Sequence, residues 1–457
     1  MKLKVISFLL LFLSSILFAT FIVNKYDKYE ISTDSKSNHT MIKGDVNKYW
    51  KGASFIKKQS EEGVPFYKSG KSYYQAFLPP KLISAFYIFI SDDLFLNEII
   101  DDAKFKVKSN NSKNYFFYLQ ILIFYISILV LLKSLKRNNL EISTICIFFL
   151  ILEPTINQFH YSFYTESIFL SLIILVLSQI INNSNNKINA FLIGFIIGVM
   201  YLQRSVAILY FLPVLFFFLL ERKNIKFYLS YFFGFLLVIS FIGFHNYQRA
   251  GLIYFTPYQS KQDFFLYLIP NVEKEKNTKQ NELEIDIIKD KMIKFKSDNN
   301  LNLSLEKDSL TYGTHLRNLS ISYLLENPIP TVKVMIKKSI HASLLNPFEV
   351  YSFYEYEYKP ANPKFRYYKN EEHKRNLKIR IIYSVIFYTI CAVGLYSMLR
   401  KKKNINLIIF LITSCLYFIS IAGWVGNPRY LSPNIIFLSI FFSYGLVELK
   451  QKFFYRL

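Results

Sequence analysis

The chain has 457 residues, of which 52% are hydrophobic and 18% aromatic, while only 19% are charged. A soluble domain carries about 25% charged residues, and long apolar runs recur here from end to end, so the composition excludes an ordinary soluble domain and predicts a bilayer as the solvent. Much of the formal net charge of +23 lies in short connections between these runs, which membrane topology explains better than nucleic-acid binding does.

The first 24 residues open with Lys2 and Lys4 and continue as an apolar run from Val5 to Val23. Such a start is similar to a secretory signal peptide. The run is longer than a usual signal core and long enough to cross a bilayer. Residues 1–24 are therefore predicted to be a retained first transmembrane helix.

The next segment, residues 25–114, is mostly polar and is predicted to be a first external loop. It contains the stretch KGDVNKYWKGASF, in which Asp45 precedes Tyr49 and Trp50. It also contains LPPKLISAFYIFI at 78–90, which is apolar but too short to span. This stretch predicts an interfacial or re-entrant helix opened by its proline pair.

Residues 115–245 are predicted to hold helices two to seven, and residues 379–457 helices eight to ten with a cytoplasmic tail. The ten predicted spans lie at 5–24, 115–132, 141–155, 165–182, 188–203, 206–220, 227–245, 379–399, 405–422 and 431–447. Lys and Arg gather in the connections at 133–139, 221–226 and 400–403 and at both chain ends, all on one side of this arrangement. Both termini are therefore predicted to be cytoplasmic, and the fold class is an all-α polytopic membrane protein.

The segment 246–378 is predicted to be the second large external region, because long loops cross a membrane largely regardless of their charge. Within it, the stretch at 330–345 carries apolar side chains at helical spacing, at Val332, Ile336, Ile340 and Leu344. Lysines lie elsewhere around the same helix. The pattern predicts an amphipathic helix on the membrane surface.

Ionisable residues at the ends of spans are costly and are functional candidates by default. On the predicted external face they are Asp45, Lys81, Glu153, His160, Glu166, Arg204 and Arg429. They form no charged line through the bilayer, which favours surface chemistry over transport, because transporters place their charges near the midplane.

The motifs that are absent narrow the chemistry further. No Gly-rich phosphate loop follows a strand, and neither HExxH nor GxSxG occurs in the sequence. All three cysteines lie inside apolar runs, which argues against disulfides and a cysteine metal site. The external face has no supply of nucleotide-activated donors. These points predict a membrane enzyme that uses a donor carried across on a lipid.

Six motifs follow one another along the chain: GDVNKYWKGASF, YYQAFLPPKLISAFY, LEPTINQFHYSFYTESIFLSL, GFIIGVMYLQRSVAILYFLP, FHNYQRAGLIYFTP and GNPRYLSPNIIF. In this order, and on the predicted external side, they resemble the GT-C superfamily of glycosyltransferases, in the branch of protein O-mannosyltransferases and aminoarabinose transferases (family 39 and relatives). Each motif is weak alone, but the six together cover most of the chain. One departure is Val46, where many relatives carry the second acid of a pair.

The resemblance implies a GT-C-type fold and an inverting transfer of a sugar from a polyprenyl-phosphate donor to an acceptor hydroxyl. It implies Asp45 as the general base and Glu166 as a second catalytic-site carboxylate that orients hydroxyl groups. The substrate-binding residues are expected to be Tyr49, Lys81, His160, Arg204, Arg429 and Tyr430. The cations among them would hold the leaving phosphate, and Tyr49 with Trp50 would line the sugar.

No cofactor is required by these motifs, and a divalent metal stays an open hypothesis because Val46 breaks the acidic pair. The expected acceptor is a lipid, a glycan or a protein. Membrane lipids are expected partners and nucleic acid is not. The site is expected on the outer face of the cytoplasmic membrane.

Simpler roles and other functions stay open. Asp45 could only cap a helix, Glu166 could only complement a helix dipole, and the two arginines could be headgroup anchors. A lipid-linked glycan flippase or other transporter would need charges around a central cavity and short external loops. An O-antigen polymerase or ligase would place one large loop late in the chain and depend on arginines rather than on a first-loop Asp.

Overall fold

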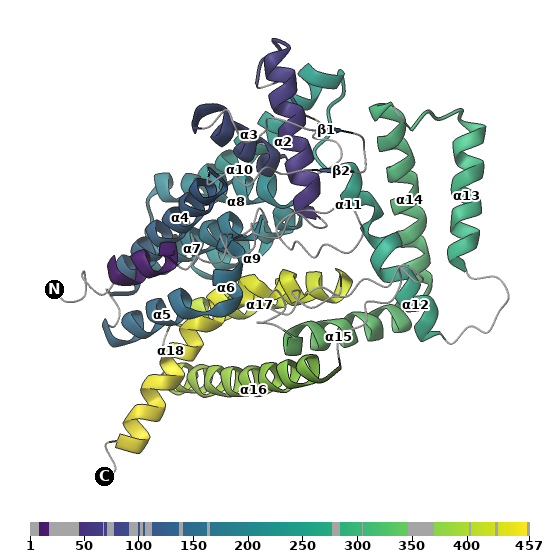
Figure 1. The fold of residues 1–457 in the computed structure, drawn as a ribbon. Helices are drawn as coiled ribbons and strands as arrows, with labels where there is room; N and C mark the ends of the chain where they lie inside the picture. Colours follow the sequence, from purple (N-terminus) through teal and green to yellow (C-terminus); the bar gives the residue numbers. More distant parts are fainter. Residues whose placement is uncertain are drawn as a thin grey trace.

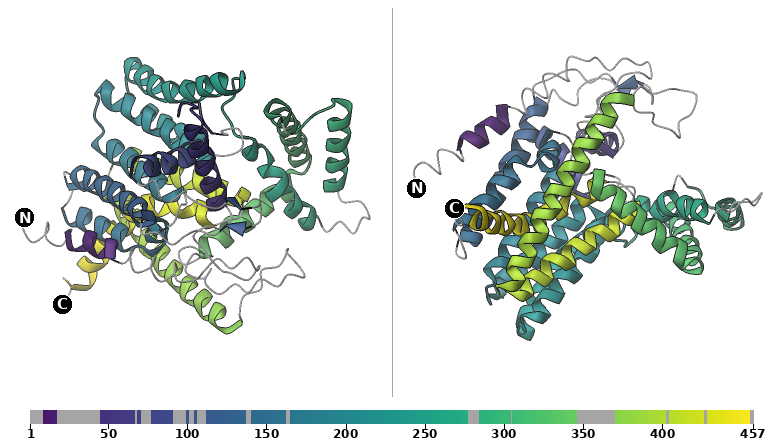
Figure 2. Two further views of the ribbon diagram at one scale, coloured as in Figure 1. Left: turned by 45° about the horizontal axis from the view of Figure 1, so that its top comes forward. Right: turned by 90° about the horizontal axis from the view of Figure 1, so that it is seen from below.

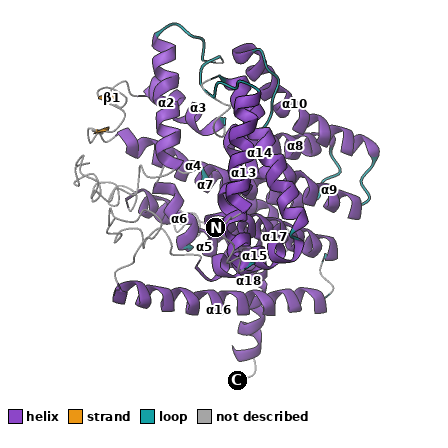
Figure 3. Ribbon diagram, turned by 90° about the vertical axis from the view of Figure 1, so that its right-hand side faces the viewer, coloured by secondary structure: helices purple, strands orange, loops and turns teal. Residues whose placement is uncertain are grey.

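The protein is described by a computed structural model. The residues that it describes are 9–17, 45–66, 68–70, 77–90, 99–100, 104–105, 112–136, 140–161, 165–276, 284–303, 305–345, 370–401, 404–425 and 428–454. These residues are almost entirely helical. The strands among them are β1 (Ile99–Ile100) and β2 (Lys104–Phe105), which pair antiparallel (Figure 3).

The helices follow a helical stretch at residues 9–17 in this order: α2 (Asp45–Glu61), α3 (Leu78–Ile90), α4 (Ser112–Lys136), α5 (Leu140–Leu152), α6 (Pro154–Asn157), η3 (Gln158–Tyr161), α7 (Glu166–Asn182), α8 (Lys187–Gln203), η4 (Ser205–Tyr210), α9 (Phe211–Leu220), α10 (Ile225–Ala250), α11 (Tyr258–Asp263), η5 (Phe264–Leu268), α12 (Ile269–Glu275), α13 (Glu284–Asp298), α14 (Glu306–Glu326), α15 (Pro328–Leu345), α16 (Asn370–Arg400), α17 (Ile405–Val425), η7 (Pro428–Leu431) and α18 (Ser432–Phe454).

Helices occur at each of the ten predicted spans. Among the described residues, five helices are long and apolar enough to cross a membrane, at 115–136, 225–250, 381–400, 405–425 and 429–453. Four shorter apolar helices lie at 141–152, 166–182, 187–203 and 205–220. The predicted all-α polytopic architecture is therefore confirmed, while the assignment of ten crossings and of the segments between them stays a prediction.

Asparagines mark the ends of several apolar helices on one side of the bundle. Asn183 ends α7 in the left-handed conformation, with φ of 43°, a conformation that Asn tolerates better than most residues. The side chains of Asn186 and Asn224 accept hydrogen bonds from Ile188 and Phe227, and so begin α8 and α10. These caps satisfy backbone N–H groups that the first helical turn leaves without partners.

Glycines allow two pairs of helices to approach closely. A Cβ atom at Gly194 of α8 would overlap the carbonyl oxygen of Tyr231 in α10, and one at Gly394 of α16 would overlap that of Phe441 in α18. Small residues permit such close packing where lipid gives helices no hydrophobic reason to associate. Gly198, one turn after Gly194 on α8, lies against Val238 of α10 in the same pair of helices.

The bundle and the helices from α12 to α15 pack around separate hydrophobic cores. The core of the bundle contains Phe124, Phe169, Tyr210 and Phe418, and a smaller core joins α12 to α15. In Figure 1, α13 and α14 stand on one side of the molecule, away from the stretch at 9–17 and the last turns of α18. The two views of Figure 2 show the same separation.

The two amphipathic segments predicted from the sequence are helices in the structure. The stretch at 78–90 forms α3, with its proline pair in the first turn. The stretch at 330–345 lies within α15, where the side chains of Val332, Ile336 and Ile340 are each more than half exposed. The opposite side of α15 packs on the end of α17, where the Ser339 hydroxyl donates to the carbonyl of Ile419 at 3.0 Å. A contact of the exposed apolar side with the bilayer stays a prediction.

Candidate active site

Three charged residues meet where helices end at one face of the bundle. Glu166 begins α7. Arg204 follows the last residue of α8 in an extended backbone conformation that turns its side chain away from the helix path. Arg429 lies in the short η7 turn before α18. Each residue thus sits at an abrupt end of an apolar helix, which is why charged side chains occur there at all.

The carboxylate of Glu166 binds both arginines. Its Oε1 accepts a hydrogen bond from Nη1 of Arg204 at 2.6 Å and lies 2.8 Å from Nε of Arg429, a charge contact without hydrogen-bond direction. The exposed fraction rises from 1% at Glu166 to 6% at Arg204 and 15% at Arg429. Two guanidinium groups thus share one carboxylate oxygen, and the more accessible of the two belongs to Arg429.

Aromatic rings complete the walls of this cluster. The guanidinium of Arg204 lies 4.6 Å from the centre of the Tyr430 ring and 5.4 Å from that of Phe169. The guanidinium of Arg429 lies 5.6 Å from the Tyr430 ring. Cation–π contacts of this length stabilise partly desolvated guanidinium groups and hold their planes in place. Tyr430 therefore contacts both arginines.

Two neighbours that the sequence did not single out also belong here. The side-chain amide of Gln203 donates to the backbone carbonyl of Thr165 at 3.1 Å, and the Thr165 hydroxyl donates to Oε2 of Glu166 at 3.2 Å. Within the described part of the chain, the buried Oε1 of Gln203 accepts no hydrogen bond. The only sequence signal was that each residue precedes a charged one, which is weak.

His160 lies beside the cluster rather than in it. Its Nδ1 is 2.8 Å from the hydroxyl of Ser167, the residue after Glu166, and its ring packs 4.5 Å from that of Phe124. Burial lowers the pKa of His160 to about 3, because a charged imidazole is poorly solvated there. The side chain is therefore neutral at physiological pH.

Glu153 is a further buried acid near this face, in the short connection before α6. It accepts hydrogen bonds from the Thr155 hydroxyl and from the backbone N–H of Ile156, each at 3.0 Å. The hydroxyl of Tyr383 in α16 donates to it at 3.2 Å. These three donors hold both oxygens of the buried carboxylate in place.

Lys81 lies in a different neighbourhood from the arginine cluster. Its ammonium donates to the carbonyl of Phe66 and lies 4.8 Å and 5.3 Å from the rings of Phe66 and Phe77. Burial and the positive charge of Arg249 lower its pKa to about 8. The ring of Phe77 is 4.8 Å from that of His245 near the end of α10. Lys81 thus fixes the first external segment against α10.

The first-loop candidates lie at the start of α2. The helix begins at Asp45, so a capping or first-turn position is compatible with its backbone. Tyr49 is half-buried one turn later. The side chains of Asp45 and Trp50 lie outside the described residues, and the predicted proximity of Asp45 to Glu166 and Arg429 stays a prediction.

A metal site is not evident among the side chains that the structure describes. No three His, Cys, Asp or Glu side chains gather there in an arrangement that could hold an ion. His160 contacts the Ser167 hydroxyl and the Phe124 ring, and it belongs to no such group among the described residues. The hypothesis of a metal at Asp45 falls outside this test, because the side chain of Asp45 is not described.

Comparison with known proteins gives a distant structural likeness. No family model matches the sequence, and no curated protein matches it. The apo form of an oligosaccharyltransferase from Archaeoglobus fulgidus is similar in structure, with a TM-score of 0.46, 13% sequence identity, and coverage of 97% of this chain and 51% of that one. A second structure, of the archaeal oligosaccharyltransferase AglB from Archaeoglobus fulgidus in complex with an inhibitory peptide and a dolichol-phosphate, is also similar. Its TM-score is 0.46, with 12% sequence identity and coverage of 97% of this chain and 51% of that one. The chain thus spans about half the length of these proteins.

Proposed function

We propose that this protein is a membrane glycosyltransferase of the GT-C superfamily that transfers a sugar, with inversion, from a polyprenyl-phosphate donor to an acceptor hydroxyl. The contact of Glu166 with Arg204 and Arg429 carries the proposal. These residues come from three of the six ordered sequence motifs and are up to 263 positions apart, yet they share one carboxylate oxygen at one face of the bundle.

The arginine cluster is suited to hold the leaving phosphate. Its two guanidinium groups share the Glu166 carboxylate, and the guanidinium of Arg429 is the more accessible of the two. A guanidinium can bind two phosphate oxygens at once. Charge that develops on the phosphate as the glycosidic bond breaks is stabilised most by cations already fixed in place, and Glu166 and Tyr430 fix them here.

Asp45 is proposed as the general base. Its carboxylate takes the proton of the acceptor hydroxyl as that oxygen attacks the anomeric carbon of the sugar. The bond between this carbon and the phosphate oxygen breaks with its electron pair, and polyprenyl phosphate leaves on the side of the arginines. Tyr49, one turn after Asp45 on α2, is proposed to line the sugar.

Glu166 is proposed to act in the site through the groups that it orients. It holds both guanidinium groups, and its second oxygen is bonded to Thr165, which leaves it poorly placed to take a proton from an acceptor. The neutral His160, bonded to Ser167 beside it, supports the same end of α7. Lys81 is proposed to contribute to binding by holding α3 in place over α10.

The distribution of charge supports this function over the two alternatives. The described ion pairs lie at helix ends and in the long external segment rather than along the middle of a central cavity, as a transporter would need. The first external segment forms the ordered helices α2 and α3, which a polymerase with a single late loop would not require. The site is proposed to face outward from the cytoplasmic membrane, with both termini cytoplasmic and a lipid, glycan or protein as acceptor.

The proposal is tested by transfer from defined donors. Purified protein in liposomes is mixed with labelled polyprenyl-phosphate sugars and, as the source of acceptors, with membranes that lack the protein. Label should pass to the acceptors in those membranes. No label should pass when nucleotide sugars replace the lipid donors. Transfer from nucleotide sugars alone, or binding of the lipid donor without release of polyprenyl phosphate, would contradict the proposal.

A further inference from the structure

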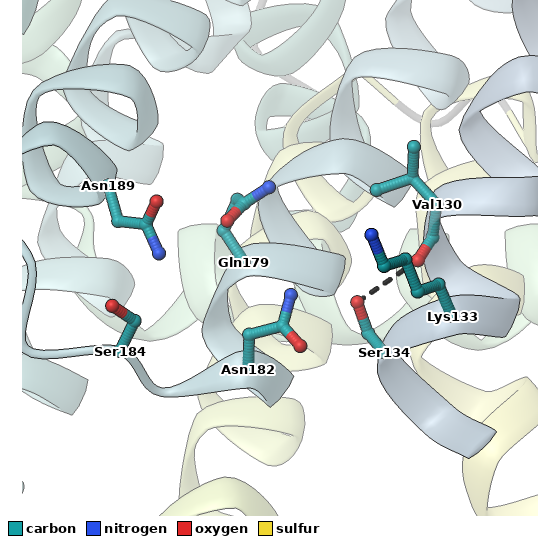
Figure 4. Close-up of a pocket in the computed structure, with 7 residues that line it drawn as sticks. All are labelled: Val130, Lys133, Ser134, Gln179, Asn182, Ser184 and Asn189. Atoms are coloured by element: carbon teal, nitrogen blue, oxygen red, sulfur yellow. Dashed lines mark hydrogen bonds between the residues drawn. The ribbon is translucent and has the colours of Figure 1, made fainter. Parts of the chain in front are cut away.

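A polar pocket lies at the end of the bundle opposite to the Glu166 cluster. It has a volume of about 390 Å³ and opens between the last turns of α4 and α7 and the start of α8. Because α7 begins at Glu166 and α8 ends before Arg204, these two helices connect the pocket to the candidate active site. The residues that line the pocket are Val130, Lys133, Ser134, Gln179, Asn182, Ser184 and Asn189 (Figure 4).

The lining combines one cation with several hydrogen-bonding groups. It presents an ammonium, three carboxamides and two hydroxyls, and none of the seven residues is acidic. In Figure 4 the side chain of Lys133 extends from α4 toward the residues of α7. The Ser134 hydroxyl donates to the carbonyl of Val130 at 3.0 Å, while the ammonium of Lys133, the amides of Gln179 and Asn189 and the hydroxyl of Ser184 are further donors in the lining. A single cation among amide donors suits a singly charged, oxygen-rich group such as a phosphodiester.

An apolar surface leads from this pocket along α4. Leu122, Ile126 and Leu129 precede Lys133 at intervals of four, three and four residues, so all lie on one face of the helix with it. Their side chains are 44%, 50% and 46% exposed. The helix is long and apolar enough to cross a membrane. A molecule with its charge at Lys133 would therefore find an apolar path for a hydrocarbon chain beside it.

We propose that this pocket binds the headgroup of an anionic glycerophospholipid. The phosphodiester lies against Lys133 and the amides of Gln179 and Asn189, and the hydroxyls of the headgroup fill the polar remainder of the pocket. One acyl chain follows the exposed face of α4. A phosphate group is the shared chemistry, and the apolar path along α4 favours a lipid over free phosphate. The inference does not depend on the proposed transferase function.

The test uses the full-length protein, stripped of lipid in detergent and titrated with phosphatidylglycerol while bound lipid is counted by native mass spectrometry. Wild type should bind phosphatidylglycerol more tightly than phosphatidylcholine. Lys133→Gln should weaken phosphatidylglycerol binding about fivefold, the effect of one lysine at a membrane surface. Asn189→Leu should weaken it as well. Lys136→Gln is the matched control, because Lys136 is an exposed lysine in the same last turn that does not line the pocket.

Three results would overturn the inference. If Lys133→Gln and Lys136→Gln weakened phosphatidylglycerol binding equally, the lipid would be attracted by the general charge of the surface and not bound in the pocket. Equal affinity for phosphatidylcholine would mean that the anionic headgroup is not recognised. Competition by millimolar inorganic phosphate, with no dependence on acyl chains, would assign the pocket to free phosphate. Each variant is first checked for an unchanged elution profile, so that unfolding is not read as lost binding.

Discussion

Replacement of Asp45 by Asn is expected to lower the rate of sugar transfer by about 10³-fold, within the range that general base catalysis contributes. The amide keeps the size of the side chain but cannot accept the proton of the acceptor hydroxyl. The affinity for the polyprenyl-phosphate donor should change little, because we propose that the arginine cluster, and not Asp45, binds the leaving phosphate. The measurement is transfer of labelled sugar by protein in liposomes, with donor binding determined separately.

Two further variants separate the proposed base from a helix cap. Asp45→Ser keeps a side chain that caps helices as well as Asp does, so the capping role predicts an active protein and the catalytic role an inactive one. Glu61→Gln, at the exposed end of the same helix α2, should keep full activity. A fully active Asp45→Ser protein beside a misfolded Asp45→Ala protein would leave Asp45 with a structural role only.

The helices of the membrane bundle were predictable because their pattern is strong. An apolar run near twenty residues long has few alternatives to a helix, and all ten predicted runs are helical where the structure describes them. The short α5 and α8 were harder, since 13 and 17 residues also suit buried helices. The helices from α11 to α15 gave a weaker signal. Their amphipathic faces cover a separate core, and the sequence predicted a helix at only one of them.

The sequence predicted which charged residues lie in the candidate site, but not which of them contact one another. Glu166, Arg204 and Arg429 stood out because charge at the end of an apolar run is costly. Nothing in the sequence said that one carboxylate oxygen would bind both arginines, since that depends on how α7, α8 and α18 pack. Gln203 and Thr165 were missed because uncharged polar residues at helix ends are common. Lys81 contacts Phe66 and Phe77 rather than the arginines. These are tertiary contacts, which no sequence pattern indicates.

Replacement of Glu166 by Gln is expected to be the most destabilising change in the site, because the buried guanidinium of Arg204 and the half-buried guanidinium of Arg429 both lose the carboxylate that they share. Removal of one member of a buried ion pair costs roughly 3–5 kcal/mol. Arg429→Gln should cost less, because Glu166 keeps its 2.6 Å contact with Arg204 and Arg429 is the most exposed of the three. The pair Glu166→Leu with Arg204→Met should cost less than Glu166→Gln alone, since the buried guanidinium of Arg204 is then removed together with its partner.

The variants of the cluster should rank differently in transfer activity than in stability, and this difference tests the proposed function of the cluster. Transfer per folded molecule should fall by about 10²–10³-fold in Arg429→Gln, the usual cost of removing one group that stabilises developing charge. Glu448→Gln is the control, because Glu448 is another buried acid held by Lys401 and Ser397 at the opposite end of α18. It should lower the unfolding temperature without changing transfer per folded molecule. An Arg429→Gln protein with reduced stability but unchanged transfer would mean that the arginines anchor the helices and do not bind the leaving phosphate.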